Sequence, residues 1–227
     1  MGRVSRAYTS AEQWVDRVVH WFGITGAIIG IIVLMIAAAL VTEREPLLWG
    51  SLIVYSVGLL GMFVCSALCN HDLSDSSRWA GIFRRLDHAA ILLMIAATYT
   101  PLALHVLGGV TGWVLFAVVW SVALVGMALR LFHRQPLEAR SSLALYLILG
   151  WIGVFVLYPL VASASPVVLG LILLGGLLYC AGVPFHLWRH LTFHKAIWHG
   201  FVLAAAASHY VAVLLGVALT GGAASSS

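Results

Sequence analysis

The stretch HWFGITGAIIGIIVLMIAAALV, residues 20–41, decides the fold class of this 227-residue chain. It contains no Asp, Glu, Lys or Arg, and its length matches the roughly 20 residues with which a helix crosses the hydrocarbon core of a bilayer. Six more predominantly apolar runs follow, at 48–69, 87–107, 110–132, 143–162, 166–187 and 195–219. The sequence therefore predicts an all-α membrane protein, a bundle of seven transmembrane helices.

The composition supports a membrane domain and excludes several other classes of protein. Hydrophobic residues make up 62% of the chain and charged residues 9%, whereas a soluble domain is about half apolar and a quarter charged. The net charge of +4 is spread along the sequence and forms no basic patch, so we expect no nucleic-acid partner. The three cysteines lie within apolar runs and give no disulfide framework. The partners that this composition favours are membrane lipids.

The apolar runs indicate one membrane domain with two short flanks. We expect residues 1–19 to form an amphipathic N-terminal segment, residues 20–219 the seven-helix domain, and residues 220–227 a flexible tail. The connections between the runs are short, which leaves no room for a soluble domain.

The basic residues are distributed unevenly between the two sides of the predicted bundle. Eleven of the twelve Lys and Arg residues fall in the N-terminal segment or in the connections after the second, fourth and sixth helices, and only Arg44 falls on the other side. Lys and Arg accumulate on the cytoplasmic side of membrane proteins. We therefore expect a multi-pass protein of the cell (inner) membrane, with its N-terminus in the cytoplasm and its C-terminus outside.

Glu12, Asp16 and His20 form a polar stripe that leads into the first apolar run. Their spacing of four residues places all three on one helix face. Two interpretations stay open from the sequence alone. Either the stripe closes an internal cavity, or it is the solvated face of an interfacial helix.

Further polar residues lie where the second helix ends and where the third and seventh helices begin. Asn70 follows the second run, Asp87 opens the third, and Lys195 and His199 share one face of the seventh. Ionisable groups at membrane depth are unfavourable unless they are paired, so they mark candidate functional sites. Because all three helix ends lie on the cytoplasmic side, we expect these four residues to converge on one polar site.

Four motifs give the chain a resemblance to a known family. They are SALCN at residues 66–70, RRLDHAAI at 84–91, AATYTP at 96–101 and IWHGFV at 197–202 with His209 beyond it. These motifs resemble those of the hemolysin III family, the bacterial branch of the progestin and adipoQ receptor superfamily. The resemblance extends over nearly the whole chain, and seven spans with a cytoplasmic N-terminus also match that superfamily.

The resemblance implies a zinc site on the cytoplasmic side. The family pattern has Ser-x-x-x-His on the second helix, the Asp of Asp-His on the third and His-x-x-x-His on the seventh, with the three histidines as zinc ligands. Ser66, Asp87 and His199 match this pattern, whereas Asn70 and Lys195 stand where two of the histidines belong. The zinc cofactor therefore does not carry over together with the matching residues.

Two arrangements of the polar site fit these departures. In the first, His71 and His194, each one residue away from a family position, bind zinc together with Asp87 and His199. In the second, no metal is bound, and the ammonium group of the seventh helix supplies the positive charge of a network. The members of this charge network are Asn70, Asp87, Lys195 and His199.

Three functions remain open on these grounds. The first is a non-catalytic role in membrane lipid homeostasis or lipid sensing. The second is a zinc-dependent, ceramidase-like hydrolase of lipid amides, with Ser66 and Asp87 as candidate catalytic residues. Without zinc, Ser66 would need His199 as its base. The third is a cytolytic, pore-forming protein, although several of the predicted helices lack the polar stripe that a pore requires.

Overall fold

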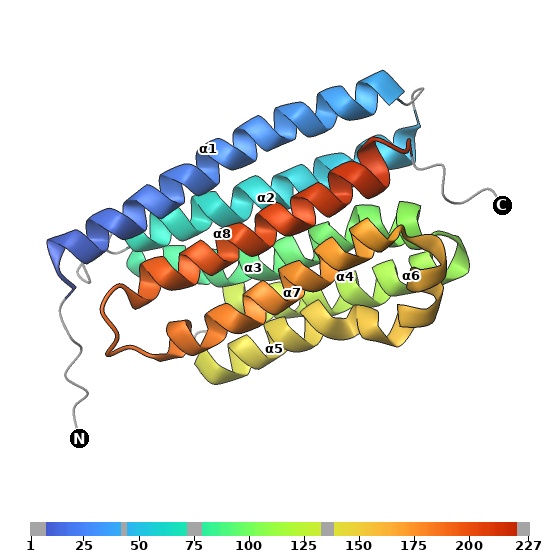
Figure 1. Ribbon diagram of the computed structural model, residues 1–227. Coiled ribbons are helices and arrows are strands. Elements are labelled where there is room, and N and C mark those ends of the chain that lie inside the picture. The colour runs from blue at the N-terminus through green and yellow to red at the C-terminus, as the bar shows by residue number, and fades with distance from the viewer. Residues whose placement is uncertain (1–7, 42–44, 72–78, 133–138, 222–227) are drawn as a thin grey trace.

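Figure 1 shows long helices that run side by side in a computed structural model of the chain. The structure describes residues 8–41, 45–71, 79–132 and 139–221, apart from the side chains of residues 71 and 139–141. The α-helices are α1 (Ser10–Val41), α2 (Pro46–His71), α3 (Ala80–Pro101), α4 (Gly109–Phe132), α5 (Ala139–Trp151), α6 (Leu157–Ser163), α7 (Pro166–Leu187) and α8 (His194–Val213). The shorter turns are η1 (Leu102–Leu107), which continues α3, η2 (Ile152–Val156), which joins α5 to α6, and η3 (Leu214–Ala218), which continues α8.

Seven segments within the described residues are long and apolar enough to cross a membrane. Helices α1, α2, α4 and α7 each provide one span, and the other three combine α3 with η1, α5 with η2 and α6, and α8 with η3. The prediction of an all-α bundle of seven transmembrane helices is confirmed. The first span begins at Ser10 and not at residue 20, because the polar stripe and the first apolar run lie on one continuous helix.

A capping box fixes the start of α1. The hydroxyl oxygen of Thr9 accepts a hydrogen bond from the backbone amide of Glu12 (3.2 Å), and the Glu12 carboxylate accepts one from the backbone amide of Thr9 (3.0 Å). This exchange satisfies amides that have no partner within the first helical turn. It also orients the first turn of α1, which contributes to the candidate site.

Helix α3 lies at the centre of the bundle, and its span is the most buried of the seven. Helices α2 and α4 pack directly against it, α1 and α8 pack against each other, and α7 packs against α8. One core cluster centres on Leu34, Leu52 and Val213 of α1, α2 and α8, and a second centres on Leu92 and Val119 of α3 and α4. Many large apolar side chains remain exposed on the outer faces, as expected where helices contact lipid.

The helix type changes at Pro101, within the AATYTP motif. The α-helical hydrogen bonding of α3 gives way at this residue to the π-helical turn η1. Just before the change, the hydroxyl of Tyr99 donates to the carbonyl of Gly150 (2.8 Å) and accepts from the amide of Gly153 (3.0 Å). Tyr99 therefore stabilises the point where α5 gives way to η2, and it ties that broken span to α3.

Gly112 of α4 provides a test of the packing around η1. A Cβ atom at this buried position would overlap the backbone carbonyl oxygen of Ala103, which cannot move aside as a flexible side chain can. We expect Gly112→Ala to lower the stability of the detergent-solubilised protein by on the order of 1–3 kcal/mol. Gly170→Ala is the matched control, because nothing lies within 4 Å of its Cβ position. Equal unfolding midpoints for the two variants would contradict the packing of α4 against η1.

The predicted orientation can be tested at the chain's C-terminus. Helix α1 begins and η3 ends at opposite ends of the bundle (Figure 1), as an odd number of spans requires. The charge distribution predicts that a C-terminal alkaline phosphatase fusion is active and that a C-terminal green fluorescent protein fusion is dark. The reverse pattern would place the N-terminus outside.

Candidate functional site

The polar stripe of α1 faces the interior of the bundle. Glu12, Asp16 and His20 are only 4%, 6% and 2% exposed. Of the two interpretations that the sequence leaves open, the solvated helix face is therefore excluded. Buried carboxylates and imidazoles require partners, and each member of the stripe has them.

Each residue of the stripe contacts a different part of the bundle. Glu12 accepts a hydrogen bond from the backbone amide of Phe193 (3.0 Å), the residue that precedes α8 and has a left-handed backbone with φ of 61°. The carboxylate of Asp16 accepts one from Nδ1 of His199 on α8 (2.6 Å). Nε2 of His20 lies 3.2 Å from the hydroxyl of Ser66 on α2. The stripe therefore joins α1 to both α8 and α2.

The hydrogen bonds of His20 indicate the roles of its two ring nitrogens. Nδ1 donates to the backbone carbonyl of Asp16 (2.7 Å), because a carbonyl oxygen only accepts, and this leaves Nε2 facing the Ser66 hydroxyl. The sequence suggested His199 as the base for Ser66, but the structure places His20 next to this hydroxyl. His199 instead points its Nδ1 at Asp16.

Asp16, His20 and His199 form a group that could hold a metal ion. One ligand atom from each residue lies within 4.8 Å of the other two, and the His20 and His199 rings meet edge to face with centroids 4.4 Å apart. Two imidazoles and one carboxylate are a ligand set that suits zinc and leaves a coordination position open. In their chemistry and burial these three residues therefore fit the metal. Only His199 of this triad belongs to the ligand set that the sequence suggested.

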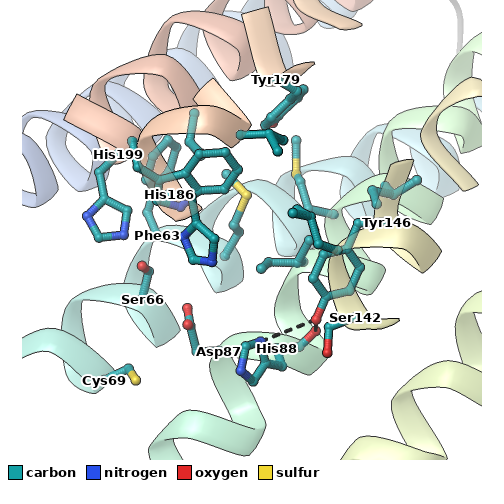
Figure 2. A pocket seen from close by; sticks show the side chains of 18 of the residues that line it. Phe63, Ser66, Cys69, Asp87, His88, Ser142, Tyr146, Tyr179, His186 and His199 are labelled. Carbon is teal, nitrogen blue, oxygen red and sulfur yellow. Dashed lines mark hydrogen bonds between the residues drawn. The ribbon is translucent and has the colours of Figure 1, made fainter. Parts of the chain in front are cut away.

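Asp87 of α3 lies across from the triad. Its carboxylate interacts with Ser66, His199 and Lys195. Figure 2 shows the Asp87 carboxylate beside the Ser66 hydroxyl, with the rings of His199 and His186 above them in this view. The structure therefore brings the three residues that match the family pattern, Ser66, Asp87 and His199, to one place at the ends of three helices.

The two residues that depart from the family pattern contact each other. Nζ of Lys195 donates to the side-chain oxygen of Asn70 (3.4 Å), and Asn70 in turn donates to the backbone carbonyl of Ser66 (2.9 Å). The same ammonium lies 4.3 Å from the centroid of the Tyr8 ring, within range of a cation–π interaction. Among the described residues, no carboxylate approaches Lys195 within 4.0 Å, so its interaction with Asp87 acts over a longer distance.

The structure does not place His71 or His194, the two histidines proposed as shifted zinc ligands, in the group that could hold a metal ion. The side chain of His71 lies outside the described residues. His194 is buried at the first turn of α8, where its Nε2 lies 3.1 Å from the Tyr8 hydroxyl. It is not among the three residues that approach one another closely enough to share a metal ion.

A cavity of about 860 Å³ extends from this polar group into the bundle. Figure 2 shows that its lining combines polar side chains from opposite walls with apolar ones between them. The polar lining residues that the sequence did not single out include Arg130, Tyr146 and His186. Arg130 was counted only as a charge on the cytoplasmic side, and the other two lie within helical runs whose inward face no periodicity reveals.

A comparison with known families agrees with this site. The family model described as Haemolysin-III related matches residues 8–210, which include every residue of the polar site. The chain belongs to the hemolysin III family. The resemblance inferred from the four motifs is therefore confirmed.

Relatives of this hemolysin III protein match it over most of their length. The hemolysin-3 homolog of Bacillus subtilis (strain 168) is 33% identical over 207 residues, which cover 91% of this chain and 95% of the relative. Hemolysin-3 of Bacillus cereus is 34% identical over 203 residues, or 89% and 90% of the two chains. The human monocyte to macrophage differentiation factor is 28% identical over 212 residues, or 90% and 84%. Together with the seven spans, these relatives make the chain a multi-pass membrane protein, and the bacterial ones fit an inner-membrane location.

The contact between Asp16 and His199 can be measured with a double-mutant cycle. We expect Asp16→Asn and His199→Ala each to destabilise this hemolysin III protein, because each leaves a buried polar partner behind. The double variant should lose less than the sum, with a coupling of about 1–3 kcal/mol. Arg17→Gln, a change at an exposed neighbouring residue, is the control. Additive losses in detergent unfolding experiments would contradict the contact.

Proposed function

We propose that this protein acts in membrane lipid homeostasis by binding one lipid molecule in the cavity. The observation that carries the proposal is the combination of a cavity of about 860 Å³ with an apolar body and a polar end. Its volume falls in the range of about 300–1,000 Å³ that is typical of small-molecule sites. Occupancy of such a site can report on the lipid composition of the membrane, because the ligand stabilises the state that binds it.

The distribution of side chains around the cavity suits an amphiphile. Apolar groups such as Phe63, Met94 and Val202 line its body and can contact an acyl chain. Polar groups from α2, α3 and α8, among them Ser66, Asp87 and His199, lie at one end and can hydrogen-bond a head group. A wholly apolar ligand would leave these buried groups without partners, which is unfavourable.

Blocking the cavity tests this proposal. Ile91 lines the cavity, and we expect Ile91→Trp to reduce the lipid that stays bound through detergent purification from about one molecule per chain to well below one. Ile32→Trp, on the exposed outer face of α1, should keep the wild-type amount. Native mass spectrometry counts the retained molecules. Equal lipid content in both variants, or none in the wild type, would contradict binding in the cavity.

A second candidate function is zinc-dependent hydrolysis of a lipid amide. It is favoured by the triad of Asp16, His20 and His199, which would hold the ion at the polar end of the cavity. A bound zinc ion would supply Lewis acidity to a substrate carbonyl. Around it, the Ser66 hydroxyl oxygen and the Asp87 carboxylate can each accept a hydrogen bond from the head group.

The metal content of the untagged protein decides between the two candidates. Hydrolysis predicts about one zinc ion per chain by elemental mass spectrometry, lost in His20→Ala and in His199→Ala. His194→Ala should keep the metal, because His194 lies outside the triad. If wild-type protein from zinc-replete cells holds no zinc, the hydrolase is rejected and the lipid-binding proposal stands alone.

A further inference from the structure

Arg130 is a buried positive charge whose partner is missing from the described residues. It lies in the last turn of α4 and is only 8% exposed. Its Nε atom is buried without a hydrogen-bond partner, and within the described residues its guanidinium group forms no ion pair. A guanidinium group stays charged in proteins, so it cannot avoid the unfavourable burial by losing its proton. This side chain therefore requires a negative partner.

The surroundings of Arg130 form a second polar wall of the cavity. The guanidinium carbon lies 6.0 Å from the centroid of the Tyr146 ring. The Tyr146 hydroxyl lies 3.2 Å from the backbone carbonyl of His88 and 3.3 Å from its Nδ1. Figure 2 shows Tyr146 and His88 together, with Ser142 beside them, on the side of the cavity away from His199. Arg130 lines the same cavity.

Within the described residues, the neighbouring carboxylate forms no ion pair with Arg130. Asp87 precedes His88 on α3, but it interacts with Ser66, His199 and Lys195. Successive residues of a helix point about 100° apart, and Figure 2 shows the Asp87 side chain beside Ser66 and the His88 side chain beside Tyr146. The first wall contains the carboxylate of Asp87, with Asp16 behind it bonded to His199, whereas the second wall presents a guanidinium group.

We propose that Arg130, together with Tyr146 and His88, binds the anionic head group of the amphiphile whose acyl chain occupies the cavity. This inference rests on the lipid-binding function proposed above and names the charge of its ligand. The planar guanidinium group matches two oxygens of a carboxylate or a phosphate. The Tyr146 hydroxyl donates to the His88 carbonyl and faces Nδ1 of its ring, which leaves Nε2 of the imidazole to donate to the head group. The apolar lining between the walls can hold the chain.

The test compares ligands that differ only in the head group. Delipidated protein in a neutral detergent is titrated with oleate, with oleyl alcohol, with oleoyl lysophosphatidate and with inorganic phosphate, and the dissociation constants are measured. We expect oleate or the lysophosphatidate to bind at least about ten-fold more tightly than the alcohol, and inorganic phosphate alone not to bind. The stronger of the two anionic lipids identifies the head group as a carboxylate or a phosphate.

Variants assign the charge preference to Arg130. Arg130→Gln should remove the preference while the affinity for oleyl alcohol stays within about two-fold, and Arg130→Lys should keep part of it. Arg17→Gln, an exposed arginine off the cavity, should leave all affinities unchanged. Without ligand, Arg130→Gln should unfold at the same temperature as the wild type or higher, because it removes a buried charge that forms no ion pair with any described residue.

Several results would overturn the inference. If oleate and oleyl alcohol bind the wild type equally, lipid binding stands but the anion site is rejected. If Arg130→Gln unfolds at a markedly lower temperature without ligand, the arginine is a structural residue. If inorganic phosphate alone binds as tightly as the lipids, the site recognises a free anion and not an amphiphile. If none of the four compounds binds, the proposed function fails together with the inference.

Discussion

The architecture of the polar end depends on the hydrogen bond between Asp16 and His199. A carboxylate on a transmembrane helix is unfavourable without a partner, and α8 supplies that partner at 2.6 Å. One turn to either side, Glu12 binds the amide of Phe193 and His20 meets Ser66. These contacts fix α1 against the first turns of α8 and the last turns of α2. They also orient the side chains that form one wall of the cavity.

The cavity follows from the arrangement of helix ends at this wall. Four helix ends lie at the same side of the bundle: α2 and α7 end there, and α3 and α8 begin there. Their polar residues line the cavity at this end of the apolar core. Asp87 and His88 stand between the two polar walls and contribute one side chain to each. The ammonium of Lys195 and the carboxylate of Asp87 lie on one wall, and the guanidinium group of Arg130 lies on the other. This separation of charges gives an amphiphile a defined orientation in the cavity.

Much of the fold could be predicted from the sequence, because seven apolar runs of membrane-spanning length leave few alternatives. The burial of the first turns of α1 could not be predicted from the sequence. Its polar stripe is equally compatible with a solvated helix face, and only the packing of α8 against it shows that the stripe is buried. The topology suggested that Asn70 and Lys195 would approach each other, and their side chains lie 3.4 Å apart. The contact of His199 with Asp16 could not be predicted from the sequence, because it depends on how α1 packs against α8. Arg130 was hidden for a different reason. A positive charge at a cytoplasmic helix end has an ordinary topological explanation, and only its burial distinguishes it.

The most direct test of the account is an experimental density map of the protein in lipid nanodiscs. We predict elongated density in the cavity between α3 and α8, with the head group of the ligand beside Arg130 and Tyr146, and an intact contact between Asp16 and His199. A cavity closed by inward-moving side chains, with no space for a ligand between the two polar walls, would contradict it.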